Sequence, residues 1–130
     1  MRAIRLSLLG AGLALAACGE TDERPATWSY ISATIIQPSC GTARCHSANS
    51  AVFGLQLDTI EGGYTQLVGV APGEGVPQGQ NLVVPGNPDA SKLMWMLRGI
   101  ESQRMPPDEA LPEGDIALIE RWILDGARFE

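Results

Sequence analysis

Hydrophobic residues recur at helical spacing near the middle of the N-terminal half of the chain. Trp28, Ile31 and Ile35 are three and four residues apart, which places them on one face of a helix. Thr27 directly precedes them and is a residue type that caps helix starts. We expect Pro38 to end this helix, because proline lacks an amide hydrogen and clashes with the preceding turn.

The same spacing predicts three further helices. The first covers 60–68, the second opens at Pro88 or Asp89 and runs to Arg98, and the third runs from about Pro112 to Asp125. Glycines at 99 and 126 directly follow the last two, as is typical of helix ends. Residues 71–79 are rich in Gly and Pro and are predicted to be loop. The pattern therefore indicates an all-α fold of three to four short helices with long loops.

The first residues have the pattern of a signal peptide. Arg2 and Arg5 precede an apolar run over 6–17, and twelve helical residues span about 18 Å, short of a hydrocarbon core of about 30 Å. The run ends in Leu15-Ala16-Ala17-Cys18, which resembles a bacterial lipobox. That resemblance implies cleavage before Cys18 and lipidation of the cysteine, which gives a durable membrane anchor. The alternative is an ordinary cleaved signal peptide with an incidental cysteine.

The chain then divides into a signal peptide (1–17), a lipidated cysteine with a flexible tether (18–27) and one domain (28–130). Gly19, rather than an aspartate, follows Cys18, and the resemblance to bacterial sorting signals then favours the outer membrane, with the domain in the periplasm. Removal of 1–17 leaves 113 residues and takes the formal net charge from −6 to −8. This acidity argues against nucleic acid as a partner.

Cysteine and histidine are scarce, and most of them stand together in Cys40-Gly-Thr-Ala-Arg-Cys45-His46. A cysteine pair with histidine directly after the second cysteine is the chemistry of covalent haem attachment, in which two thiols form thioethers and histidine binds the iron. The common spacing has two residues between the cysteines, whereas this chain has four. On a helix, positions five apart would diverge by about 140°, so the insert must loop out, and Gly41 permits that.

Two other interpretations of this stretch are a disulfide and a metal site. A disulfide between Cys40 and Cys45 suits an oxidising periplasm but leaves His46 without a role. A zinc site with two cysteines and one histidine would leave the fourth position open, and no general base stands nearby.

Several motifs along 28–130 resemble class I c-type cytochromes, in particular the small haem domains of planctomycete and myxobacterial lipoproteins. In chain order, the matching stretches are Ile36-Gln37-Pro38, Cys45-His46, Gly54-Leu55-Gln56-Leu57-Asp58-Thr59, Val84-Pro85-Gly86-Asn87-Pro88, Ser91-Lys92-Leu93, Arg104-Met105-Pro106-Pro107 and Ile119-Glu120-Arg121-Trp122-Ile123-Leu124-Asp125-Gly126-Ala127. The resemblance implies a cytochrome c-like fold around one haem c.

The resemblance also implies a second axial ligand. Met105 stands where such cytochromes place a ligating methionine, opposite His46 as the proximal ligand. Two prolines follow it and would fix the loop, and a surface position is the alternative. Met94 and Met96 have apolar helical neighbours, so we expect them in the core.

Four other side chains are weaker candidates for contacts with a haem. Trp95 and Trp122 are expected in the core, against the porphyrin or between helices. Arg98 and Arg104 have the charge to pair with haem propionates, and solvated surface positions are the alternative.

The resemblance implies a lipid-tethered, monohaem electron carrier without substrate chemistry of its own. Its acidic surface favours redox partner proteins with a basic docking face. One alternative is a haem-free, cytochrome-like interaction module with a disulfide between Cys40 and Cys45. Another is a haem sensor or peroxidase-like protein with an open sixth position.

Overall fold

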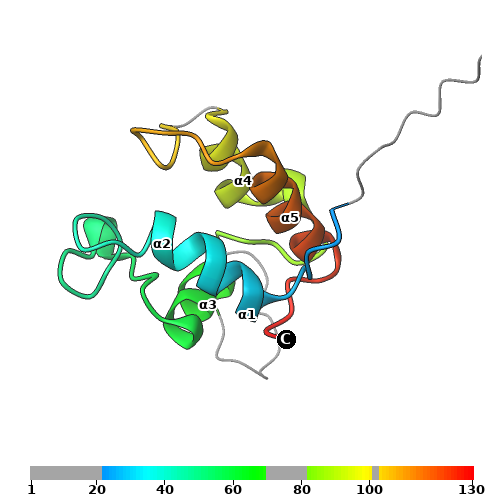
Figure 1. Cartoon of the computed structure of the whole chain (residues 1–130), viewed down its shortest axis with the longest axis horizontal. Coiled ribbons are helices and arrows are strands. Elements are labelled where there is room, and N and C mark those ends of the chain that lie inside the picture. The colour runs from blue at the N-terminus through cyan, green and yellow to red at the C-terminus, as the bar shows by residue number, and fades with distance from the viewer. Residues whose placement is uncertain (1–21, 70–81, 101–102) are drawn as a thin grey trace, which may run out of the picture.

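The computed structural model describes residues 22–69, 82–100 and 103–130. These residues form four helices and no β-strand (Figure 1), which confirms the small all-α fold. The loop predicted over 71–79 lies outside the described residues. Within the described residues, no helix has the length and apolar character needed to cross a membrane.

The first helix is continuous and passes through Pro38. It consists of α1 (Trp28–Ile31), a π-helical stretch (Ser32–Ile36) and α2 (Gln37–Ser39). The prediction that Pro38 ends the helix is therefore wrong. The amide of Gln37 bonds to the carbonyl of Ser32, five residues back, and this wider turn directly before the proline relieves the clash that a regular α-helix would impose. Thr27 precedes the helix, but its side chain makes no capping bond.

Helix α3 (Ile60–Val68) has the bounds that the sequence predicts. The hydroxyl of Thr59 accepts a 3.2 Å hydrogen bond from the amide of Gly62, which caps its start. Gly69 adopts a positive φ of 82° and ends it. Tyr64 and Leu67 are buried on its inner face.

Helix α4 (Lys92–Arg98) begins later than predicted. Residues Pro88–Ala90 form a separate 3-10 turn, and Ser91 between the two elements has extended backbone angles. The buried hydroxyl of Ser91 explains this break: it donates to the carbonyl of Asn87 at 2.8 Å and accepts from the amide of Val84 at 2.9 Å. Gly99 ends the helix as predicted.

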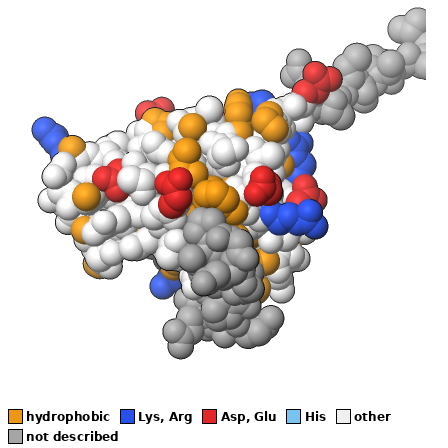
Figure 2. All heavy atoms as spheres, turned by 90° about the horizontal axis from the view of Figure 1, so that it is seen from below, with side chains coloured by type: hydrophobic (Ala, Val, Ile, Leu, Met, Phe, Trp, Pro, Cys, Tyr) orange, Lys and Arg blue, Asp and Glu red, His pale blue; other side chains and the backbone are white. Residues whose placement is uncertain are grey.

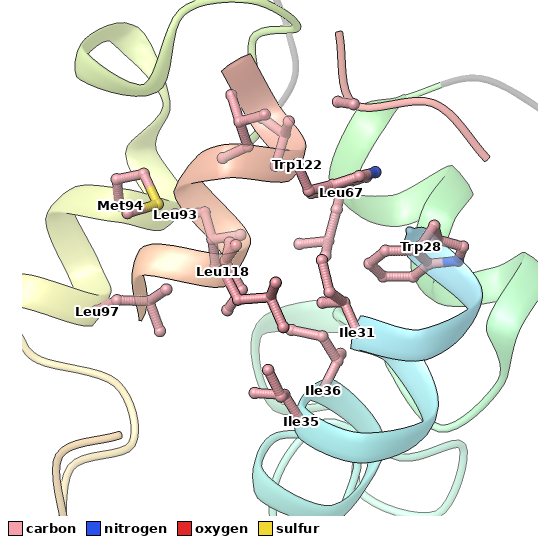
Figure 3. Close-up of a cluster of buried hydrophobic side chains, with 14 of the residues drawn as sticks. Trp28, Ile31, Ile35, Ile36, Leu67, Leu93, Met94, Leu97, Leu118 and Trp122 are labelled. Atoms are coloured by element: carbon pink, nitrogen blue, oxygen red, sulfur yellow. The ribbon is translucent and has the colours of Figure 1, made fainter. Parts of the chain in front are cut away.

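Helix α5 (Glu113–Leu124) supplies one wall of the core. Its predicted inner face is buried, and Pro112 stands just before the helix rather than within it. The rings of Trp28 and Trp122 lie 5.1 Å apart, and both indole nitrogens donate to backbone carbonyls at 2.8 Å. Figure 3 shows side chains from α1, α3, α4 and α5 meeting in this cluster. Each fully buried aliphatic side chain contributes about 1.5–3 kcal/mol.

The helices place two loops at one end of the molecule. The turn after α2 and the loop before α5 both lie at the end opposite the start of α1 (Figure 1). The first contains Cys40, Cys45 and His46, and the second contains Met105. The fold thus brings together residues that are about sixty positions apart in the sequence.

Candidate haem site

Two adjoining cavities lie where these loops meet. Their volumes are about 450 and 250 Å³, and the larger one lies within the range of about 300–1,000 Å³ typical of ligand sites. Both are lined by the side chains of Cys40, His46, Phe53, Gln103 and Met105, and Cys45 lines the smaller. The walls of the larger cavity are mostly aliphatic: Leu55, Leu57, Leu67, Leu82, Leu93, Met96 and Leu97. Together the two cavities present leucine side chains, two thiols, an imidazole and a thioether, which fits a haem.

The four-residue insert between the cysteines forms a compact turn. The amide of Cys45 bonds to the carbonyl of Thr42 at 3.0 Å, and the amide of His46 bonds to the carbonyl of Cys40 at 3.0 Å. The helix ends at Ser39, with Cys40 as its C-cap, so the two cysteines are not arranged on a common helix. Closure of the turn instead places both beside the same cavity.

Gly41 is required in this turn because of a close backbone approach. A Cβ atom at this position would lie 2.6 Å from the carbonyl oxygen of Leu57 and 2.9 Å from the Cα of Asp58. No side chain fits there without a shift of the backbone. The insert therefore packs tightly against the segment that leads into α3.

The two cysteines differ in their environments. Cys40 is buried and Cys45 is half-buried, and both thiols are free. Burial, and secondarily the neighbouring Cys45, raise the pKa of Cys40 to about 11. The thiol of Cys40 is therefore protonated at neutral pH in the haem-free chain.

The imidazole of His46 is held by backbone groups of the same loop. Its Nδ1 lies 3.1 Å from the carbonyl oxygen of Val52. Because that oxygen only accepts, Nδ1 carries the proton and Nε2 keeps the lone pair that an iron ion needs. The carbonyl of His46 accepts a 2.6 Å hydrogen bond from the amide of Leu57, which fixes the backbone as well.

Met105 is positioned by α4. Its amide bonds to the carbonyl of Met96 at 2.9 Å, and its half-buried side chain faces both cavities. Pro106 and Pro107 line the smaller cavity beside it. The structure thus gathers Cys40, Cys45, His46 and Met105 around one space, while their roles toward a haem stay a prediction. Cys18 lies outside the described residues.

Much of the cavity lining was not predicted from the sequence, and Met96 and Phe53 are two examples. Met96 was expected in the core, but it is half-buried and lines the larger cavity, whereas Met94 is buried as expected. Met96 is three residues after Leu93, which also lines the cavity, and this helical spacing is the sequence signal that could have indicated the position of Met96. Phe53 is 90% exposed at the edge of both cavities with a positive φ of 57°, and no periodicity indicates such a position.

The weaker candidates do not line the cavities. Trp95 is exposed and donates to the carbonyl of Asp89, whereas Trp122 is buried in the aromatic core. Arg98 pairs with Glu120 at 2.7 Å, and the Nε of Arg104 contacts the carbonyl of Pro106 at 3.4 Å. None of these four side chains lines either cavity.

The family model of planctomycete cytochrome c matches residues 43–109, just over half of the chain. The chain belongs to the planctomycete cytochrome c family. The match includes Cys45, His46 and Met105, and it begins three residues after Cys40. Neither the curated proteins nor the solved structures contain a significant match.

Membership in the cytochrome family indicates haem c binding and electron transfer. A bound haem would supply a redox-active iron, and the chain would supply ligands and an apolar environment. Among residues 22–69, 82–100 and 103–130, no three His, Cys, Asp or Glu side chains cluster as a metal site, which gives the zinc interpretation no support.

Proposed function

We propose that this protein is a lipid-anchored, monohaem c-type cytochrome that carries single electrons in the periplasm. The main support is the smaller cavity, which has Cys40, Cys45, His46 and Met105 on its surface and adjoins the larger, leucine-lined cavity. In the proposed site, each thiol would hold the haem through a thioether formed by addition of its S–H bond across one vinyl group. His46 and Met105 would be the ligands of the iron.

The ligand pair sets the expected redox behaviour. Methionine with histidine raises the reduction potential relative to two histidines. His46 is the only histidine of the chain, so a single chain cannot provide two imidazoles. The leucine-lined walls would restrict water near the iron. They would also raise the reduction potential, because an apolar environment disfavours the more highly charged oxidised state.

The lipid anchor and the periplasmic location rest on the sequence of 1–18. In this proposal Cys18 carries the lipid, and the outer membrane is favoured. The net charge of −8 without residues 1–17 supports redox partner proteins with a basic docking face, so association should weaken as salt rises.

Expression in a bacterial host that exports the chain and attaches haem tests this function. The proposal predicts a haem-staining band on a denaturing gel at the mass of the chain, and a one-electron wave in a redox titration. A colourless band from exported, folded protein would contradict it. Fractionation with and without Cys18→Ser tests the anchor separately, because loss of the lipid should release the haem-stained protein into the soluble fraction.

A further inference from the structure

The segment before the first helix is tied to α5 by a group of charged side chains. Arg24 donates through Nε and one terminal nitrogen to the carboxylate of Asp22, at distances from 2.8 to 3.1 Å. Its other terminal nitrogen donates to the carboxylate of Asp115 in the first turn of α5. The guanidinium lies close over this turn, since a Cβ at Gly114 would be 3.2 Å from it.

A second arginine holds the backbone of the same segment. Arg121 of α5 donates to the carbonyl of Asp22 at 2.8 Å and to the carbonyl of Arg24. The side chains of Asp22, Arg24 and Asp115 are 31%, 34% and 21% exposed, so the group is partly shielded from water. We call these contacts of Asp22 and Arg24 with Asp115 and Arg121 the clamp. Residues 22–27 are therefore held against the domain, where the sequence predicted a flexible tether up to Thr27.

The clamp shortens the connection between the lipid and the folded domain. Without it, ten residue steps separate Cys18 from Trp28, and such a linker reaches about 33–36 Å when extended. With it, four steps separate Cys18 from Asp22, and the reach falls to about 14 Å. A domain of about 110 residues has a radius of gyration of about 13 Å, so the short connection is comparable to the radius of the domain.

The clamp and the cavities lie at opposite ends of the first helix. This helix runs from Trp28 to Ser39 and is about 18 Å long, with the clamp beside its start and Cys40 directly after its end. Figure 1 shows the turn after α2 at the end of the molecule opposite the start of α1, and Figure 2 shows acidic and basic side chains side by side near the beginning of the described chain. A membrane at the clamp end would therefore be distant from the cavities.

We propose that the clamp orients the domain on the membrane, with the cavity that contains His46 and Met105 facing away from the lipid surface. This inference rests on the proposed lipidation of Cys18. It assigns a surface of the protein to the bilayer, namely the end formed by the clamp. It also implies that the redox partner approaches from the aqueous side as a soluble protein.

The orientation can be measured on the full-length, lipidated protein in phosphatidylcholine vesicles that contain a small fraction of a gadolinium-chelating lipid. A nitroxide is attached to a ketone-bearing amino acid at Ser29, near the clamp, or at Asn49, near the cavities; both residues are exposed. This labelling does not depend on the cysteines. The gadolinium increases the relaxation rate of a nitroxide that lies near the bilayer. The ratio of this increase at Ser29 to the increase at Asn49 therefore reports the orientation of the domain.

The proposal predicts that gadolinium increases the relaxation rate of the nitroxide several-fold more at Ser29 than at Asn49. In a variant with Arg24→Gln and Arg121→Gln the ratio should fall toward one, because ten residue steps then separate the lipid from the first helix. Arg98→Gln is the matched control: it removes the similarly exposed pair with Glu120 and should leave the ratio unchanged.

Two outcomes would overturn the proposal, and they are distinguishable. Protein that fails to float with the vesicles contradicts the lipid anchor, and the orientation with it. Protein that floats but gives a ratio near one, or a ratio that the double variant leaves unchanged, contradicts the orientation alone. Thermal unfolding of each variant establishes that the ratio is read on folded protein.

Discussion

The imidazole Nδ1 of His46 lies 3.1 Å from the carbonyl oxygen of Val52, and the amide of Val52 lies 3.1 Å from the carbonyl oxygen of Cys45. Val52 thus connects the ring to the turn that carries the second cysteine. The arrangement fixes the protonated nitrogen of the ring and leaves Nε2 for a metal. The haem-free chain already has the ring and one cysteine held by a single short loop.

Replacement of the proposed distal ligand should change the haem without unfolding the protein. Met105 is half-buried in a loop, so Met105→Ala removes little core packing. We expect a shift of the optical spectrum to a high-spin form and a lower reduction potential, because the iron loses its thioether ligand. Absorbance spectroscopy and a redox titration measure both.

Met96→Ala is the matched control for Met105→Ala. Met96 also lines the larger cavity, but from α4 rather than from the loop. We expect a low-spin spectrum with at most a small change of potential. An unchanged spectrum in Met105→Ala would instead support a haem protein with an open sixth position.

The close approach at Gly41 predicts that this residue cannot be replaced. In Gly41→Ala the added methyl group would meet the carbonyl of Leu57 at 2.6 Å, and the turn must shift. We expect a loss of about 1–3 kcal/mol in the free energy of unfolding of the haem-free chain, and a reduced fraction with attached haem. Chemical denaturation and the ratio of haem to protein absorbance measure these two effects.

Gly86→Ala separates a local effect at the cysteine turn from a general loss of stability. Gly86 has a positive φ of 77° with open space around it, so alanine costs about 1–2 kcal/mol through the backbone alone. Haem attachment should be retained. If Gly41→Ala and Gly86→Ala reduced haem attachment equally, the close approach at Gly41 would have no specific role.

The two thiols of the haem-free protein should react at different rates. Cys40 is buried with a pKa raised to about 11, whereas Cys45 is half-buried. At pH 8 we expect an alkylating reagent to modify Cys45 well before Cys40, because Cys40 has a small thiolate fraction and is poorly accessible to the reagent. Single-cysteine variants and mass spectrometry resolve the two rates, and faster modification of Cys40 would contradict the described turn.

The same raised pKa predicts an alkaline loss of stability in the haem-free chain. The folded state holds the Cys40 proton up to a pH of about 11, whereas the unfolded thiol has the ordinary value of 9.0. Stability from this group is present below pH 9 and falls as the pH rises toward 11. Cys40→Ala should remove this dependence when the midpoint of chemical unfolding is measured at pH 8 and pH 10.5.

The clamp should respond to acid. Hydrogen bonds from Arg24 lower the pKa of Asp22 from 3.8 to about 2. The contribution of Asp22 to stability is present above pH 4 and is lost as the pH falls through about 2. Asp22→Asn should therefore lower the unfolding temperature at pH 7 and have no effect near pH 2. Equal unfolding temperatures at pH 7 would contradict a clamp at this residue.

The helices were largely predictable because apolar spacing and end signals agree. Leu67 and Trp122 are buried as their spacing indicates, and Gly69 and Gly99 end helices through positive φ angles. The errors at Pro38 and Ser91 have local causes that spacing does not report. A π-helical stretch accommodates the proline, and one buried hydroxyl interrupts the helix that was expected to open at Pro88 or Asp89.

The residues that carry the chemistry of the candidate site were predictable from the sequence, but the shape and the walls of the cavities were predictable only in part. Cys40, Cys45, His46 and Met105 were identified by residue type, spacing and resemblance, and the fold brings them together. Phe53 and the aliphatic walls depend on how distant segments pack, which a linear pattern does not specify. The hydrogen bonds from Arg121 to the segment at Asp22, about a hundred positions away, likewise depend on the packing of distant segments.

Proteolysis at Arg44 tests the central claim directly, because this residue lies between the two cysteines. Trypsin with a Glu-specific protease should produce a peptide 24–44 that contains Cys40 and a peptide 45–61 that contains Cys45 and His46. The account predicts that mass spectrometry of the reduced digest finds the two peptides joined through one haem, since thioethers resist reduction whereas a disulfide does not. Separate, unmodified peptides from exported protein that was matured with haem would contradict it.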